Sequence, residues 1–211
     1  MKHPHPRRGA VSKVLAVFLA FLLALLLAGG CAVTKYNDIV TKREDVDARW
    51  SAVESDYKHR SELVPQLVNT VRGAKDFESE TLEKVMEARA KATSIQISAD
   101  ALSDPDAIQS YLEAQSGLGT ALGRLFAVAE SYPALKSVDG FRDLQVQLEG
   151  IANRINVSRK DYIQSVRDFN SSVRRFPGNV VAGFGGYEVL PQFEATEAEA
   201  EVPEVDFGGG E

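Results

Sequence analysis

The stretch YKHRSELVPQLVNTV, residues 57–71, decides whether the chain begins with one long helix or with two shorter ones. Its apolar residues recur at steps of three and four, a pattern typical of a helix that packs lengthwise on other helices. Pro65 lies inside this pattern, although a proline lacks the backbone N–H that an interior helical residue donates. Arg60 lies at a position where the pattern calls for an apolar side chain.

The same steps extend back to Tyr36 without a change of phase. Nine of the eleven positions from Tyr36 to the end of the stretch are apolar or aromatic, and Arg43 and Arg60 are the exceptions. A new helix that began at Pro65 would be the alternative, but it would have no reason to keep that phase. We therefore predict one helix over 36–75 that is kinked at Pro65.

Three further helices are predicted from the same periodicity and from a composition rich in Ala, Leu, Glu and Arg. They cover 78–94, 105–132 and 138–176, with a loop at 95–103. Asp104 is a predicted N-cap ahead of Pro105, and Ser137 is a second one. Because short connections make neighbouring helices antiparallel, we expect an all-α, elongated, up-down four-helix bundle with long, partly kinked first and fourth helices.

An apolar run of fifteen residues, 14–28, stands near the N-terminus and contains no charge. Basic residues precede it: Lys2, Arg7, Arg8 and Lys13. This arrangement predicts that residues 1–30 are a signal peptide or membrane anchor. Positive charge before the run keeps the N-terminus in the cytoplasm, so the helical domain is expected on the extracytoplasmic side of a bacterial cytoplasmic membrane.

The sequence LAGGC, which ends at Cys31, resembles the lipobox of bacterial lipoproteins, in which the cysteine becomes the lipidated first residue. The alternative is an uncleaved single-pass anchor in which Cys31 stays a thiol. Either way, the N-terminal anchor ties the domain to membrane lipid. The bundle domain is predicted over 31–176.

The remaining residues, 177–211, first contain Gly and Pro and then become acidic. They include eight acidic residues and no Lys or Arg. Such a composition predicts an irregular, disordered tail. The chain also lacks a basic stripe with interleaved aromatic residues, so nucleic-acid binding is not expected.

Several segments resemble the LemA family. They are RSELVPQLVNTV (60–71), MEAR (86–89), LQVQLEG (144–150), SRKDY (158–162) and FPGN (176–179). The resemblance covers almost the whole chain after the apolar run. It implies a bacterial membrane-anchored protein with an elongated helical bundle, and it implies no particular biochemical activity.

Little in the sequence indicates catalysis. The part after the leader holds one histidine, His59, and one cysteine, whereas a zinc site needs three or four ligands and a hydrolase needs a nucleophile beside a base. Glu83 and Glu87 share a helix face at i, i+4 spacing, but paired surface acids usually belong to a solvated face. We therefore predict no catalytic, cofactor-binding or metal-binding residue, and no enzyme.

Polar residues on or beside the predicted helix interfaces are the better candidates for a site. This polar seam consists of Arg43, Arg60, Asn153, Asn156 and Asn170. Polar groups between helices specify register and alignment, and we expect Arg60 to pair with an acid such as Glu113 or Glu149. The alternative is that these residues form a shared site for a ligand or a partner.

Together these features predict a membrane-tethered, non-enzymatic interaction or scaffold protein of the cell envelope, with unidentified protein partners. Association of two or more copies is left open. The alternative function is an accessory or regulatory subunit of an envelope protease or stress-response complex, with the acidic tail as its contact. Deletion of residues 194–211 distinguishes the two, because only the second function needs the tail.

Overall fold

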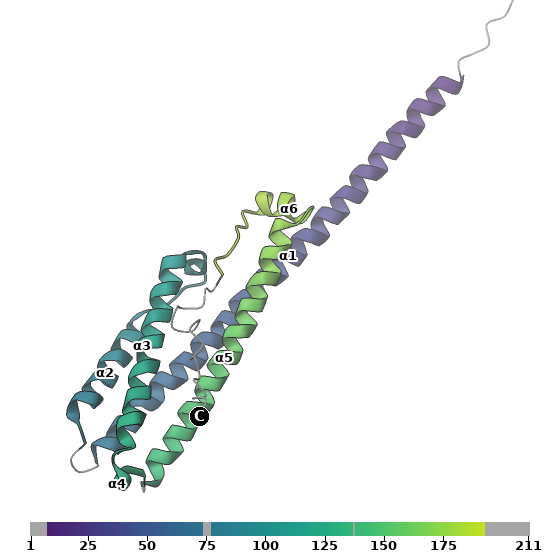
Figure 1. Ribbon diagram of the computed structural model, residues 1–211. Coiled ribbons are helices and arrows are strands. Elements are labelled where there is room, and N and C mark those ends of the chain that lie inside the picture. The colour runs from purple at the N-terminus through teal and green to yellow at the C-terminus, as the bar shows by residue number, and fades with distance from the viewer. Residues whose placement is uncertain (1–7, 74–76, 137, 193–211) are drawn as a thin grey trace, which may run out of the picture.

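The computed structural model describes residues 8–73, 77–136 and 138–192, and these residues form helices with no strand among them (Figure 1). The all-α prediction is therefore confirmed. The elements are α1 Arg8–Arg72, α2 Ser79–Ser94, the 3-10 helix η1 Asp100–Ser103, α3 Pro105–Ala129, α4 Pro133–Lys136, α5 Asp139–Arg174 and α6 Gly178–Gly185.

Helix α1 is one uninterrupted helix of 65 residues that continues through Pro65. The prediction that the proline does not end the helix is confirmed. The helix begins far earlier than position 36, because the apolar run and the first helix of the body are the same helix. Figure 1 shows its N-terminal part projecting beyond all the other helices.

The body is built from helices that pack lengthwise on one another. Helix α1 packs most extensively along α5 and also contacts α2, and α2 packs along α3. Helix α6 contacts both α1 and α5 near the end of the body from which α1 projects (Figure 1). The more specific description as an antiparallel four-helix bundle stays a prediction.

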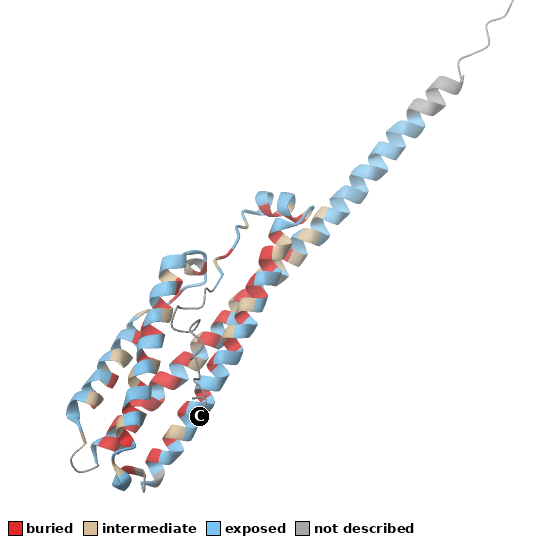
Figure 2. Cartoon of the chain, in the orientation of Figure 1, coloured by how far each residue is buried: buried red, intermediate tan, exposed pale blue. Residues whose placement is uncertain are grey.

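Burial divides α1 into two parts (Figure 2). The large apolar side chains of residues 15–27 are exposed, whereas those that recur at steps of three and four between Ile39 and Val71 are buried. The ring of Trp50 lies at the centre of the core, with its centroid 5.4 Å from that of Tyr111 in α3 and 5.2 Å from that of Tyr162 in α5. The predicted periodicity thus marks the face of α1 that the other helices cover.

The start of α3 follows the predicted chemistry. The side chain of Asp104 accepts hydrogen bonds from the backbone N–H groups of Asp106 and Ala107, and Pro105 occupies the first helical position. Helix α3 ends at Ala129, three residues before the predicted end. The predicted loop at 95–103 contains the 3-10 helix η1, and the predicted cap Ser137 lies outside the described residues.

The region from residue 177 onward differs from the prediction of an irregular tail. Residues Gly178–Gly185 form α6, and Leu190 beyond it is buried. The Gly-rich sequence has a low helix propensity, but packing against α1 and α5 stabilises the helix regardless. The acidic part of the predicted disordered tail, from residue 193, lies outside the described residues.

Candidate functional site

Pro65 explains one contact between α1 and α2. Since a proline has no N–H, the carbonyl of Ser61, four residues earlier, lacks its usual donor within the helix. Arg89 of α2 supplies a donor instead, because its Nε lies 2.8 Å from the Ser61 oxygen. The proline therefore creates an acceptor on α1 that positions α2.

Arg60 lies beside this contact and connects α1 to α3. Its Nη2 donates to the backbone carbonyl of Gln115 at 2.6 Å and to Gln115 Oε1 at 3.0 Å. The amide nitrogen of Gln115 donates in turn to the carbonyl of Ala92 in α2 at 3.1 Å. We call Arg60, Ser61, Arg89 and Gln115 the polar cluster, and it joins three helices inside the body.

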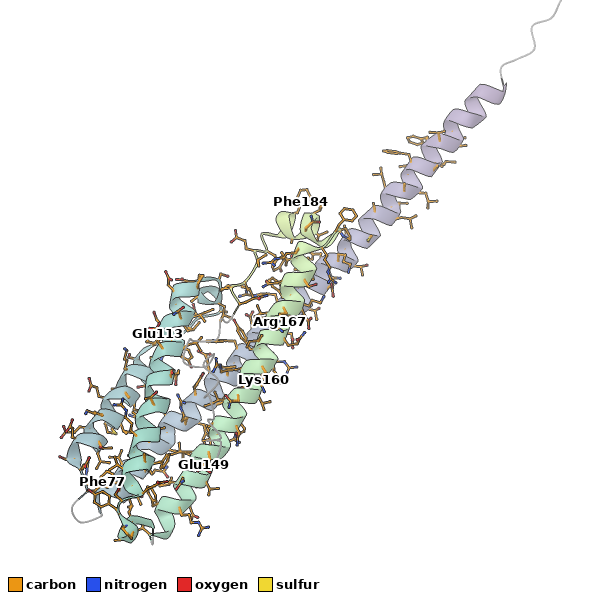
Figure 3. All side chains as sticks on the ribbon, in the orientation of Figure 1. Phe77, Glu113, Glu149, Lys160, Arg167 and Phe184 are labelled. Atoms are coloured by element: carbon orange, nitrogen blue, oxygen red, sulfur yellow. The ribbon has the colours of Figure 1, made fainter. Side chains whose placement is uncertain are left out.

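The predicted pairing of Arg60 with an acid is wrong. None of the ion pairs among the described residues includes Arg60, although its side chain is buried with only 9% exposed. Glu113 and Glu149 are exposed and accept hydrogen bonds from glutamines one turn away on their own helices, and Figure 3 labels both. The register of α3 brings an amide to Arg60, and sequence periodicity does not reveal that register.

The guanidinium of Arg60 is stabilised by groups that carry no full negative charge. It lies 5.0 Å from the centroid of the Tyr57 ring, which is within range of a cation–π contact. Burial lowers the pKa of Arg60 from its ordinary value, but a guanidinium starts so high that it stays charged at neutral pH. The core therefore contains a buried cation held by carbonyl oxygens and an aromatic face.

The other predicted polar residues make separate contacts. Arg43 is half-buried and donates to the carbonyl of Ala99 at 2.8 Å, and it also pairs with Asp47 one turn along α1 at 3.3 Å. It therefore ties α1 to the segment before η1. This contact involves no residue of the polar cluster.

Asn170 holds the segment that follows α6. Its side-chain nitrogen donates to the carbonyl of Leu190 at 2.8 Å, and its oxygen accepts from the N–H of Leu190 at 2.9 Å. Asn153 and Asn156, by contrast, are exposed and do not belong to a buried seam. They lie one or two positions from Ile155, which turns them 100–200° away from the covered face of α5 at about 100° per residue.

A groove of about 690 Å³ opens above the polar cluster, between α1, the end of α2 and α3. Its lining includes the buried residues Ser61, Gln115 and Tyr111 and, from α1, Glu54 and Lys58. The remaining lining residues are Ser51, Ser55, Ala92, Thr93, Ile95, Gln96 and Ile97. The groove therefore combines hydrogen-bonding groups, among them one carboxylate and one ammonium group on α1, with apolar side chains from the end of α2 and the residues after it.

The titratable groups in the groove are shifted by burial. Burial raises the pKa of Glu54, while hydrogen bonds from the Trp50 side chain and the Ile97 backbone oppose that rise. Burial also raises the pKa of Tyr111 well above its ordinary value, so that the phenol stays neutral at physiological pH. These groups can donate and accept hydrogen bonds, but the lining contains no histidine or cysteine that could act as a base or nucleophile.

Other features considered in the sequence lie away from this groove. Glu83, Glu87 and His59 are exposed. Among the residues that the structure describes, no group of three His, Cys, Asp or Glu side chains could hold a metal ion. Cys31 is an exposed free thiol on α1, and the helix runs through it without a break. Cleavage of the chain before Cys31 and lipidation of Cys31 stay predictions.

Arg89 and Gln115 were not singled out as site residues from the sequence. Both residues, like Arg60, occupy positions of the three–four pattern that face the other helices. A polar residue at such a position was the signal in the sequence that could have identified them. What the sequence did not show is that the three are neighbours, because that depends on how far α2 and α3 are shifted along α1.

Comparison with known proteins identifies relatives along most of the chain. A family model described as the LemA family matches residues 49–207. Magnetosome proteins MamQ 1 and MamQ 2 of Paramagnetospirillum magneticum are each 28% identical over 209 residues, which cover 92% of this chain and 77% of the relative. Protein LemA of Metamycoplasma hominis is 23% identical over 181 residues, covering 86% of this chain and 78% of the relative. None of these names denotes an enzyme.

Proposed function

We propose that this chain, which belongs to the LemA family, is a membrane-tethered helical interaction protein of the bacterial cell envelope. In this proposal the body is an antiparallel bundle of α1, α2, α3 and α5. The groove above the polar cluster receives part of a protein partner.

The continuity of α1 is the observation that carries the proposal. The helix contains the one segment among the described residues that is long and apolar enough to cross a membrane. The same helix then supplies a buried face of the body up to Val71. Because no loop separates the two parts, an anchor in the membrane would hold the body in a defined position rather than on a flexible linker.

The charges around the apolar run favour one orientation. Basic residues precede the run, so the N-terminus is placed in the cytoplasm and the body outside it. The anchor is either this uncleaved single-pass helix or a lipid on Cys31 after cleavage. Both versions attach the body to the same membrane face at nearly the same residue.

The chemistry of the groove favours binding over catalysis. Its walls present hydroxyl, amide, carboxylate and ammonium groups, which suit the hydrogen-bonding groups of a polypeptide segment. The relatives named as magnetosome proteins support a role within a larger cellular structure. Such a role needs a binding surface and requires no reaction.

Site-specific photo-crosslinking in cells tests the proposal. A benzophenone amino acid replaces Lys58, which is exposed and lines the groove, in the full chain in its native host. The matched control replaces Lys160, an exposed lysine on α5 that Figure 3 labels and that does not line the groove. Mass spectrometry then identifies the crosslinked protein. We expect a defined product from position 58 and none from position 160.

Deletion of residues 194–211 separates this proposal from the accessory-subunit alternative. If the groove makes the contact, the product at position 58 persists after the deletion. If the product disappears with the tail, the groove is not the determinant and the alternative is favoured. Recovery of the full chain in the soluble fraction of lysed cells, rather than in the membrane fraction, would contradict the proposed membrane attachment.

A further inference from the structure

Helix α6 and the residues before it expose apolar side chains that no described residue covers. Phe184 is 91% exposed and Phe176 is 83% exposed, and Val180 between them is 48% exposed. Val180 and Phe184 are four residues apart and so lie on one face of the helix. Two almost fully exposed phenylalanines on the same short segment indicate a surface that contacts something apolar.

The position of α6 identifies the candidate contact. Helix α6 packs on α1 at Tyr36, because a Cβ added at Gly185 would lie 3.1 Å from the Tyr36 ring. The Tyr187 ring that follows lies 6.1 Å from Tyr36 and 6.2 Å from Phe169 of α5, both edge-on. Figure 3 labels Phe184 at the end of the body where α1 continues into its exposed apolar part.

The charge-free length of α1 places Tyr36 at the level of the lipid headgroups. The sequence has no charged residue between Lys13 and Lys35. These intervening residues span about 31 Å at about 1.5 Å per residue, close to the ~30 Å of a hydrocarbon core. Tyr36 therefore lies a few ångströms beyond that core, within the headgroup layer. A lipid on Cys31 would place Tyr36 about 8 Å from the attachment point, again at the surface.

The charges beside α6 suit an anionic lipid surface. Arg174 and Arg175 are exposed immediately before Phe176, and residues 174–187 contain no acid. Glu188 follows directly, and Asp168 is the last acid before the segment. Aromatic rings next to basic side chains are typical of segments that lie in the headgroup region.

The segment is also held firmly against the body. Asn170 holds the backbone of Leu190 through two hydrogen bonds, and Gly178 begins α6 where a Cβ would lie only 2.0 Å from the carbonyl oxygen of Ser172. Contacts at both ends therefore fix α6 to α5. A membrane contact made by α6 would consequently orient the whole body.

We propose that α6 is a second membrane contact, in which Phe176, Val180 and Phe184 insert at the boundary between headgroups and acyl chains while Arg174 and Arg175 bind lipid phosphates. This inference rests on the membrane tether of the proposed function. It adds that the body is docked on the bilayer surface at a second point rather than held by α1 alone.

Spin labelling of the full chain tests the proposal. The Cys31→Ser chain is reconstituted into nanodiscs of phosphatidylcholine and phosphatidylglycerol, and single cysteines at Phe184→Cys or Val180→Cys carry a nitroxide. Relaxation by oxygen against relaxation by a water-soluble nickel complex reports the depth of the label. Leu22→Cys marks the anchor, and Val146→Cys is an exposed apolar control one turn from Glu149, at the opposite end of α5 in Figure 3.

The expected result is that labels at 180 and 184 favour oxygen over nickel, with a depth between those of positions 22 and 146. Water-like values at both 180 and 184, with a lipid-embedded label at 22, would overturn the second contact and leave the tether standing. A water-like label at 22 would remove the single-pass form of the tether, and the inference with it. The two labelled positions guard against an effect of losing the Phe184 ring, and matching thermal unfolding of all variants shows that each one folds.

Discussion

Residues 15–27 and residues 39–71 belong to the same helix, yet they use apolar side chains in different ways. In the first region apolar residues surround the helix and remain exposed. In the second they recur at steps of three and four and are buried, with α2, α5 and α6 packed on this part of α1 and Tyr111 of α3 in contact with Trp50 and Tyr57. A helix that is apolar on every side suits lipid, whereas one with a single apolar stripe suits a protein partner.

The comparison shows how one continuous helix can have a part suited to lipid and a part suited to packing against protein, with no loop between them. The number and the arrangement of apolar residues change along α1, while the backbone geometry stays helical throughout. Mutations in the two regions should therefore have separable consequences. Those in the second region should weaken the folded body, and those in the first should affect membrane attachment alone.

The largest expected effect is the loss of the central aromatic side chain. Trp50→Ala removes a buried ring that packs on Tyr111 and Tyr162, so the free energy of unfolding should fall by about 3–5 kcal/mol. Leu22→Ala, in the exposed part of α1, should leave it unchanged. Denaturant titration in detergent, followed by circular dichroism, measures both. Equal losses would show that the two regions do not fold independently.

The next effect concerns the buried cation. Arg60→Ala removes the hydrogen bonds to Gln115 and the packing of the side-chain stem, and it should cost about 1.5–3 kcal/mol. Arg49→Ala, on the exposed side of α1, removes only surface ion pairs with Asp45 and Asp161 and should cost less than about 1 kcal/mol. Thermal unfolding of the two variants is the measurement. An unchanged melting temperature for Arg60→Ala would favour a binding role for this residue.

A smaller effect tests the acceptor that Pro65 creates. Arg89→Met leaves the Ser61 carbonyl without its donor and should cost about 1–2 kcal/mol. In a Pro65→Ala chain the N–H of residue 65 can bond that carbonyl, so the same change should cost less. A double-mutant cycle should give a coupling free energy of about 0.5 kcal/mol or more. Additive effects would mean that the proline and Arg89 are unconnected.

The smallest effect is a dependence on pH at the groove. Burial raises the pKa of Glu54 in the folded state, so the stability contributed by its protonated form is present at low pH and is lost as the pH rises through that pKa. Glu54→Gln should therefore gain stability relative to the unsubstituted chain as the pH rises above about 4, the ordinary pKa of a glutamate. Glu62→Gln, an exposed change on the same helix, controls for the loss of one charge. A difference that is constant with pH would contradict the shift.

Periodicity predicted the helices that have a strong apolar stripe, including the passage of α1 through Pro65, and capping chemistry predicted the start of α3 at Asp104. It did not predict α6, because that helix has only eight residues, three of them Gly, and is too short to repeat a three–four pattern. That helix depends on contacts with Tyr36 and the neighbouring α5. Local sequence cannot report such contacts.

The candidate site was predictable only in part. Arg60 stood out because a charged residue occupied an inward position. Its partner, Gln115, was missed because the position of α3 along the axis of α1 decides which residue of α3 faces Arg60, and the sequence does not give that position. The groove was not foreseen for the same reason, since its walls come from α1, α2 and α3. Asn153 and Asn156 were included because of their nearness in sequence to inward residues, and a shift of one position along a helix is enough to expose a side chain.

The unbroken course of α1 also has a mechanical meaning. In the proposed single-pass form, the helix from Tyr36 to Arg72 would extend about 54 Å beyond the membrane surface at about 1.5 Å per residue. Transmembrane helices tilt by amounts that vary with bilayer thickness. A change of about 10° in tilt would swing the Arg72 end sideways by about 9 Å, since no flexible joint absorbs the rotation. A body held by α1 alone would therefore move as on a lever, with the state of the bilayer setting the position of its far end, and a second contact at α6 would oppose that motion.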